Sequence, residues 1–220
     1  MRAIAANSVT LHVREEGDPM GQPVLFANSL GTDLRLWDAV IPHLSEGLRI
    51  IRYDKRGHGL SECPPAPYSM DDLVADAEGV IEALGLAPVI FIGLSIGGMI
   101  GQRLAAKRPD LVKALVLSNT AARMGEPAMW HDRMTAIRKG GVSSLETAIL
   151  ERWFGADFRR SDDARLWGAM LSRTPTEGYL GCCAAISETD LTDETATLRL
   201  PTLAIAGSQD GASPPDLVKA

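Results

Sequence analysis

Short apolar stretches recur through the first 120 residues, and each is followed by a polar or glycine-containing loop. Stretches rich in β-branched and aromatic residues predict buried strands, whereas apolar residues spaced three or four apart predict helices packed on them. The predicted strands are residues 3–6, 9–15, 23–27, 48–53, 89–92, 114–118 and 201–207. The first two form a hairpin and the others alternate with helices, which predicts an α/β fold with a largely parallel sheet.

The clearest predicted helix covers residues 69–84. Ser69 is its expected N-cap, two aspartates in the first turn suit the positive end of the helix dipole, and Gly85 is placed to end the helix. Its apolar face consists of Leu73, Ala77, Val80, Ile81 and Leu84. A shorter helical spacing covers residues 34–41, so both segments are expected to pack on the sheet.

Between residues 121 and 199 the strand pattern is absent and only helical spacing remains. The predicted helices cover residues 128–139, 143–154, 161–172 and 177–186. A run of helices between two strands predicts a cap over the carboxyl edge of the sheet. We therefore divide the chain into an α/β core of residues 1–120 and 200–220 and a helical cap of residues 121–199, with Trp153 and Phe154 expected in the core of the cap.

The bulk composition restricts the classes of function. The 220 residues are 45% hydrophobic and 23% charged with a net charge of −6, which is typical of a globular protein and argues against nucleic-acid binding. Neither a membrane-spanning run nor a secretion signal is recognisable, which predicts a cytoplasmic protein without a membrane partner. The three cysteines form neither a disulfide framework nor a metal site, and no nucleotide-binding loop occurs, so neither metal nor cofactor is expected.

The sequence G-L-S-I-G at residues 93–97 follows a predicted buried strand and precedes a glycine-rich helix. This G-x-S-x-G pattern is typical of a nucleophile elbow, in which a sharp strand-to-helix turn holds a serine hydroxyl above the sheet. The helix N-terminus adds free N–H groups and partial positive charge next to Ser95. A glycine-rich turn of this kind could also be purely structural or bind a phosphate, so other motifs must decide.

Three further motifs occur in the order expected of one fold. Residues 54–61 read D-K-R-G-H-G-L-S, residues 199–203 read R-L-P-T-L, and residues 206–210 read A-G-S-Q-D. With the elbow and the helical insertion, they resemble the α/β-hydrolase family over nearly the whole chain. The resemblance implies an α/β-hydrolase fold with its cap after the sixth strand and with Asp210 as the carboxylate of a catalytic triad. Asp210 precedes a glycine, so it could equally be a turn residue.

Four stretches resemble one branch of that family, the 3-oxoadipate enol-lactonases. They are N-S-L-G-T-D at 28–33 with Trp37, S-N-T-A-A at 118–122, E-R-W-F at 151–154, and E-G-Y at 177–179 followed by C-C-A-A at 182–185. The resemblance implies hydrolysis of a small lactone bearing a carboxylate, in the β-ketoadipate route of aromatic degradation. Another ester or carbon–carbon bond hydrolase, or a perhydrolase-like enzyme, is the alternative within the same fold.

The expected chemistry assigns a role to each candidate residue. Ser95 attacks the lactone carbonyl and forms an acyl-enzyme, and the backbone N–H groups of Leu30 and Ile96 stabilise the oxyanion. Asp210 orients a general-base histidine. Because a carboxylated substrate calls for a guanidinium group, Arg133 is the predicted substrate-binding residue, with Trp130 beside it. Arg133 could equally be a solvated residue on a helix surface.

The general base is the difficulty, because the family order is serine, acid and then histidine. His12, His43, His58 and His131 all precede Asp210. The resemblance therefore suggests a chain that ends before its last strand, last helix and triad histidine, with little turnover by itself and an exposed sheet edge that favours aggregation. A binding protein that keeps the pocket without the base is the other reading of the same residues.

Overall fold

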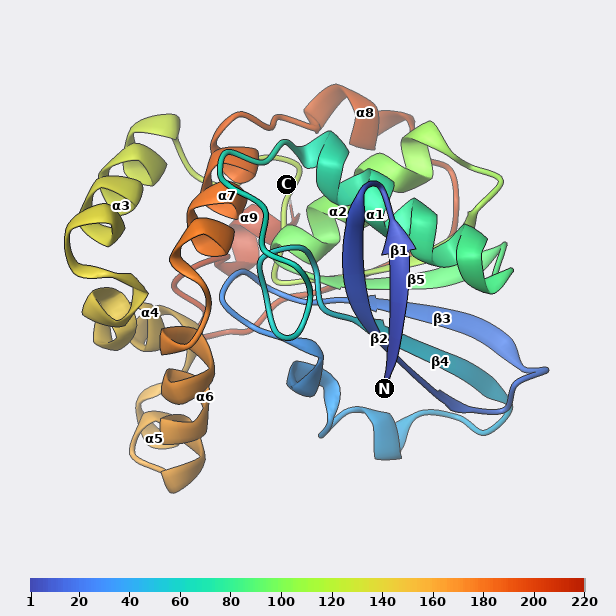
Figure 1. Ribbon diagram of the computed structural model, residues 1–220, viewed down its shortest axis with the longest axis horizontal. Helices are drawn as coiled ribbons and strands as arrows, with labels where there is room; N and C mark the ends of the chain where they lie inside the picture. Colours follow the sequence, from blue (N-terminus) through green and yellow to red (C-terminus); the bar gives the residue numbers. More distant parts are fainter. Residues whose placement is uncertain (220) are drawn as a thin grey trace.

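The computed structural model describes residues 1–219 and contains a seven-stranded sheet with helices over its carboxyl edge and on its faces (Figure 1). The strands are β1 (Arg2–Ala6), β2 (Val9–Gly17), β3 (Gln22–Ala27), β4 (Leu48–Tyr53), β5 (Val89–Leu94), β6 (Val112–Ser118) and β7 (Thr202–Ile205). Their order in the sheet is β1-β2-β4-β3-β5-β6-β7. The first two pairings, β1 with β2 and β2 with β4, are antiparallel and the rest are parallel, which confirms the predicted sheet.

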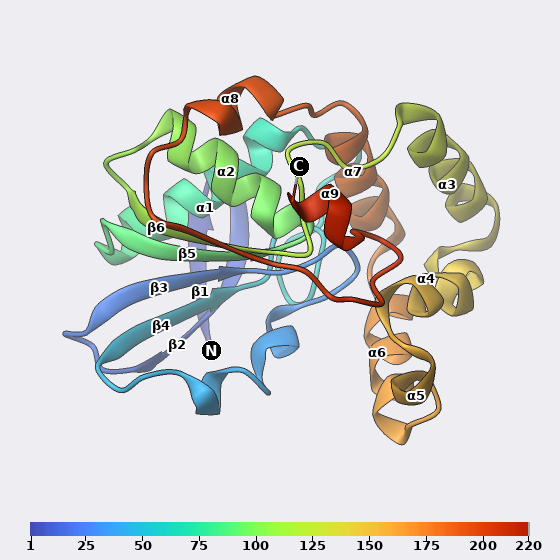
Figure 2. The same cartoon turned by 180° about the vertical axis from the view of Figure 1, so that it is seen from behind.

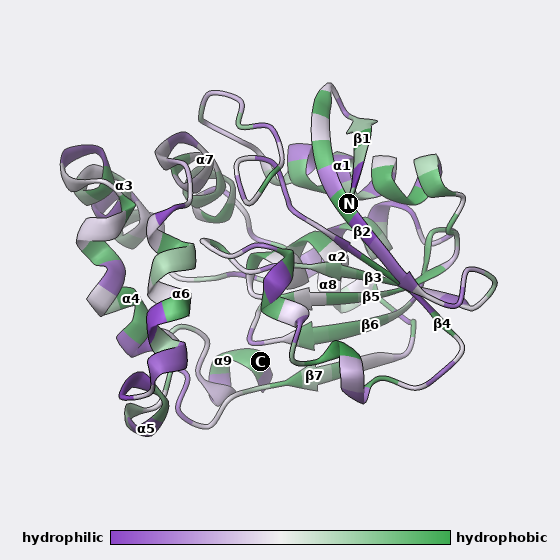
Figure 3. Cartoon of the chain, turned by 60° about the horizontal axis from the view of Figure 1, so that its bottom comes forward, coloured by the Kyte–Doolittle hydropathy of each residue, from purple (hydrophilic) through white to green (hydrophobic). Residues whose placement is uncertain are grey.

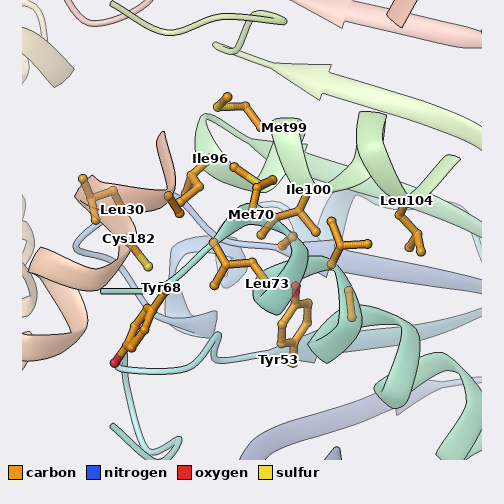
Figure 4. Packing of buried hydrophobic residues seen from close by; sticks show 14 of the residues in the cluster. Leu30, Tyr53, Tyr68, Met70, Leu73, Ile96, Met99, Ile100, Leu104 and Cys182 are labelled. Carbon is orange, nitrogen blue, oxygen red and sulfur yellow. The ribbon is translucent and has the colours of Figure 1, made fainter. Parts of the chain in front are cut away.

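One face of the sheet carries α1 (Met70–Leu84) and α2 (Ile96–Lys107) (Figure 2). The prediction for α1 is confirmed: Ser69 and Asp72 form a reciprocal capping box, and Gly85 ends the helix in a left-handed conformation. Apolar side chains of α1 and α2, among them Leu73 and Ile100, interdigitate above the sheet (Figure 4). This larger core holds α2, and therefore Ser95 at its start, rigidly on β5.

The opposite face has a smaller core in which Phe26 packs against Trp37 with ring centroids 4.9 Å apart. Trp37 belongs to η1 (Leu34–Trp37), which is followed by η2 (Ile41–His43). The single helix expected over residues 34–41 is thus two short 3₁₀ turns, the second with a proline in its first turn. Hydrophobic residues continue along β5, β6 and β7 on this sheet (Figure 3), where Leu203 and Ile205 of β7 are exposed.

The helices between β6 and β7 lie beside the carboxyl edge of the sheet (Figures 1 and 2). They are α3 (Pro127–Gly140), η3 (Val142–Leu145), α4 (Glu146–Trp153), α5 (Ala156–Arg159), α6 (Asp162–Ser172), α7 (Thr176–Ser187) and α8 (Thr192–Thr197); α9 (Pro215–Lys219) follows β7. The short α5 and α8 were not predicted. Of the helices in this stretch, α8 packs on α2 of the sheet layer.

Residues 1–219 lack two kinds of structural feature. None of the helices within this range is both long enough and apolar enough to cross a membrane. In the same range, no group of three or more histidine, cysteine, aspartate or glutamate side chains is arranged to hold a metal ion.

Candidate active site

Ser95 stands at the sharp turn between β5 and α2. Its backbone has φ 56° and ψ −121°, a strained conformation for a residue other than glycine. The flanking glycines are required, because a Cβ on Gly93 would lie 2.3 Å from the Gly97 carbonyl oxygen and one on Gly97 would lie 2.1 Å from the Ala27 carbonyl oxygen. The chain thus forms the sharp strand-to-helix turn that the G-x-S-x-G pattern predicts.

Backbone contacts fix the turn and leave the Ser95 hydroxyl free of strong partners. The Ser95 N–H donates to the Ser118 carbonyl oxygen at 2.9 Å, and the Ser95 carbonyl oxygen accepts from Thr120 Oγ1 at 2.7 Å. The Ser95 Oγ has one neighbour within bonding range in residues 1–219, the Met124 sulfur at 3.9 Å. A hydroxyl with such a weak partner is available to attack a ligand.

The Ser95 side chain lines a cavity of about 160 Å³ at the carboxyl edge of the sheet. Asn119 and Asp210 line the same cavity from the ends of β6 and β7, and Trp153 and Phe154 line it from the cap. The expectation that Trp153 and Phe154 lie in the core of the cap was thus incomplete. Phe154 does stack in an aromatic cluster of the cap, 4.7 Å from Phe158 between ring centroids, but it also forms a wall of the cavity.

Asp210 is held by hydrogen bonds to both carboxylate oxygens. Its Oδ1 accepts from the N–H groups of Ala212 and Ser213 at 2.7 and 3.1 Å, which makes Asp210 a turn residue as well. Its Oδ2 accepts from Asn119 Nδ2 at 2.6 Å. Asn119 has a positive φ of 49° and was given no role from sequence. Its position directly after β6, at the edge where the other site residues gather, is the signal that could have identified it.

The two predicted oxyanion donors come from two different segments of the chain. Leu30 belongs to the loop after β3 and lines a second cavity with Ser95, and Ile96 is the first residue of α2. Neither backbone N–H donates to an acceptor within residues 1–219. Two free N–H groups beside a nucleophilic hydroxyl are the arrangement that stabilises a tetrahedral oxyanion.

This second cavity has a volume of about 120 Å³ and is lined by Trp130, Arg133 and Arg152. The Arg133 guanidinium carbon lies 4.8 Å from the centre of the Trp130 ring, a cation–π contact, and Trp130 Nε1 donates to the Met124 carbonyl oxygen at 2.6 Å. Burial and the neighbouring Arg133 charge lower the pKa of Arg152, against the attraction of Asp210. Arg152 was not predicted, because its sequence position on α4 does not reveal which face it presents.

None of the four histidines forms a hydrogen bond to Ser95 or Asp210 within the described 219 residues. His12 Nδ1 lies 2.7 Å from an Asp54 oxygen, and His43 and His131 are exposed. His58 is completely buried, and its Nε2 accepts from the Gly31 N–H at 3.0 Å. Burial and the Lys55 charge hold the pKa of His58 well below its usual value, so His58 is neutral.

Comparisons with known proteins agree with this architecture. A family model described as "alpha/beta hydrolase fold" matches residues 22–220. The chain is 33% identical to 3-oxoadipate enol-lactonase 2 of Acinetobacter baylyi over 94% of its length and 78% of the relative. Among solved structures it is similar to the enol-lactonase from Burkholderia xenovorans LB400, with 37% identity and a TM-score of 0.96 over 99% of this chain and 85% of that one. A hydrolase from Pseudomonas aeruginosa has 35% identity and a TM-score of 0.95, covering 99% and 84%.

Proposed function

The chain belongs to the α/β-hydrolase family, and we propose that it hydrolyses 3-oxoadipate enol-lactone to 3-oxoadipate with Ser95 as nucleophile. The observation that carries the proposal is one cavity lined by Ser95, Leu30, Arg133 and Arg152. A nucleophile, an oxyanion donor and two cations facing the same space suit an ester that also bears a carboxylate. The similarity to two proteins named enol-lactonases supports this substrate over other esters.

The reaction follows from the placement of these groups. The Ser95 oxygen attacks the lactone carbonyl and loses its proton to a base, and the negative charge on the carbonyl oxygen is stabilised by the Leu30 and Ile96 N–H groups. When the ring carbon–oxygen bond breaks, the enol oxygen leaves and is protonated, and the enol tautomerises to the ketone. Water then cleaves the acyl-enzyme and releases the second carboxylate of 3-oxoadipate.

The electrostatics of the cavity favour an anionic substrate. In the described part of the chain neither Arg133 nor Arg152 forms a salt bridge, although both line the cavity. Two neighbouring guanidinium groups without a carboxylate repel one another, and a bound carboxylate removes part of that repulsion. A protein with a net charge of −6 needs such a local positive site to bind an anion.

The general base is the part of the triad that residues 1–219 do not place beside Ser95. We propose that the 220-residue chain by itself turns over slowly, because loss of one triad member typically costs a factor of about 10⁴–10⁶. The cavity between Ser95, Asn119 and Asp210 is large enough to admit a small base. Free imidazole should therefore accelerate the reaction by taking the proton of the Ser95 hydroxyl.

The test is hydrolysis of the enol-lactone by the 220-residue chain, with and without imidazole, beside the Ser95→Ala variant. We expect an imidazole-dependent rate that is absent in Ser95→Ala and exceeds the rate on a neutral aryl ester. Faster hydrolysis of the aryl ester would contradict the lactonase assignment. Lactone binding without any Ser95-dependent hydrolysis would favour the binding-protein reading instead.

A further inference from the structure

Lys55, in the loop after β4, is a buried cation without an acidic partner. The residue is 2% exposed and forms no salt bridge within residues 1–219. Its Nζ instead donates to the carbonyl oxygens of Ser29 at 2.5 Å and Thr32 at 3.4 Å. Burying an ammonium group costs free energy. Because the reaction of Ser95 makes no direct use of Lys55, its burial requires another explanation.

The Ser29 carbonyl belongs to the same peptide unit as the Leu30 N–H. This unit is trans and planar, so its carbonyl oxygen and its N–H point in opposite directions. Because the carbonyl oxygen is directed at Lys55, the Leu30 N–H is directed away from Lys55, and Leu30 lines the cavity with Ser95. The orientation of one oxyanion donor is thereby linked to the position of the Lys55 ammonium.

Two neutral contacts hold the same loop. Thr32 Oγ1 donates to the Ser29 carbonyl oxygen at 2.9 Å, and the Gly31 N–H donates to His58 Nε2 at 3.0 Å. Hydrogen bonds in which the donor is charged are roughly twice as strong as neutral ones. Lys55 is therefore the strongest single constraint on the peptide that carries the Leu30 N–H.

We propose that Lys55 is a positioning residue that forms the oxyanion hole by holding the Ser29–Leu30 peptide with its carbonyl turned away from the cavity. The proposal rests on the proposed function of Ser95 as nucleophile. Without the ammonium, the Leu30 N–H is directed at the oxyanion for a smaller fraction of the time. Arg133 binds the substrate independently of this peptide, so the loss falls on the chemical step.

Titration of Lys55 provides a second readout. Burial lowers the pKa of Lys55 to about 8, against the opposing influence of Cys182, Asp54 and Asp33. His58 also faces Lys55 and is neutral. Because the folded pKa lies below the ordinary value of 10.5, the unfolded chain binds more protons between these two values. Between these two pH values the contribution of Lys55 to the free energy of unfolding rises with pH. Deprotonation of Lys55 therefore stabilises the fold, and a loss of reactivity in this range is not caused by unfolding that this deprotonation induces.

The experiment measures the rate constant for modification of Ser95 by a 4-nitrophenyl alkylphosphonate. The reaction is run with imidazole, which takes the proton of the Ser95 hydroxyl. The Ser95 oxygen forms the new bond to phosphorus, 4-nitrophenolate leaves, and a phosphonyl oxygen occupies the oxyanion hole. We expect Lys55→Met to react about 10-fold more slowly or worse, given that one oxyanion donor is worth about 10²–10³. Lys113→Met, the same change at an exposed lysine of β6, should react as the wild type does. The difference between wild type and Lys55→Met should shrink as the pH rises through about 8.

The possible outcomes distinguish the proposed role of Ser95 as nucleophile from the proposed role of Lys55. If the wild-type chain is not modified at Ser95, with Ser95→Ala as the reference, the proposed function fails. If the wild type is modified and a folded Lys55→Met reacts equally fast, the role of Lys55 alone is overturned. Should Lys55→Met not fold, Thr32→Val leaves Lys55 as the only side chain on the Ser29 oxygen. Above a pH of about 8, Ser95 should be modified more slowly in this variant than in the wild type. If the ratio of the two rate constants does not change with pH, the proposal is overturned.

Discussion

At the scale of single residues, two arginines give the cavity beside Ser95 a local positive charge. Arg133 and Arg152 both line it, and Trp130 holds the Arg133 guanidinium by its ring face. A hydrogen bond to a charged group contributes about 1.5–3 kcal/mol, and an arginine can bind a carboxylate with two such bonds. These two side chains should therefore distinguish the carboxylated lactone from a neutral ester of the same size.

Replacing Arg133 with glutamine should raise KM for the carboxylated lactone by about 10- to 100-fold, because a charge-assisted bond to the substrate is lost. The value of kcat should change much less, and KM for a neutral methyl ester should stay the same. Arg138→Gln, an exposed position on the same helix, is the matched control. Equal effects of Arg133→Gln on the charged and the neutral substrate would contradict a carboxylate-binding role.

Sequence identified the residues whose chemistry is tied to a local motif and overlooked those whose role depends on tertiary placement. Ser95, Ile96 and Asp210 stand at strand ends that the hydrophobic pattern already located. Arg152 and Lys55 were overlooked, because the direction of a side chain on a cap helix or in a loop is set by packing with distant segments.

At the scale of elements, a buried ion pair fastens the loop after β4 to α1. Arg56 Nε and Nη2 donate to the two carboxylate oxygens of Asp76 at 2.7 and 2.6 Å, and Asp76 is completely buried. Asn7 adds a hydrogen bond to the same carboxylate at 3.2 Å. Because the same loop supplies Lys55 and His58, this pair couples the stability of α1 to the geometry of the active site.

Asp76→Asn should lower the free energy of unfolding by about 3 kcal/mol, because it leaves the Arg56 charge buried without its main partner. Glu82→Gln on the same helix removes an acid that pairs with Arg108 at 3.2 Å on the surface, and it should cost less than about 1 kcal/mol. Urea denaturation of both variants measures the difference. Similar losses in the two variants would show that the buried pair contributes no more than the surface pair.

Element type was predicted well where an apolar pattern runs over several residues, and poorly where the element is very short or interrupted. The strands and α1 have regular apolar patterns, which is why the sequence indicated their positions to within a few residues. The segment at residues 34–41 is interrupted by the polar Arg35 and Asp38 and is followed by Pro42, and it forms two 3₁₀ turns. The helices α5 and α8 are only four and six residues long, which is too short for a helical period to be recognised.

At the scale of the whole molecule, the sheet ends at a strand whose residues are all exposed. β7 pairs with β6 in the described residues, and Leu203 and Ile205 are 56% and 45% exposed. Exposed apolar edge strands promote pairing between chains.

We expect the 220-residue chain to self-associate through this edge as its concentration rises. The double variant Leu203→Lys/Ile205→Lys should remain monomeric, because charged side chains disfavour pairing at a sheet edge. Leu166→Lys changes a leucine on the cap that is even more exposed, at 69%, and should associate as the wild type does. Light scattering after size exclusion measures all three. A monomeric wild type, or association that persists in the double variant, would contradict this role of β7.

The central claim is that Ser95 attacks an ester whose carboxylate is held by the arginines of the same cavity. Its most direct test is mass spectrometry of the 220-residue chain after reaction with a 4-nitrophenyl ester that carries a terminal carboxylate. The account predicts an acyl group on the peptide containing Ser95, formed faster than with the matched neutral ester and absent in Ser95→Ala. Acylation at another residue, or equal rates with the charged and neutral esters, would contradict it.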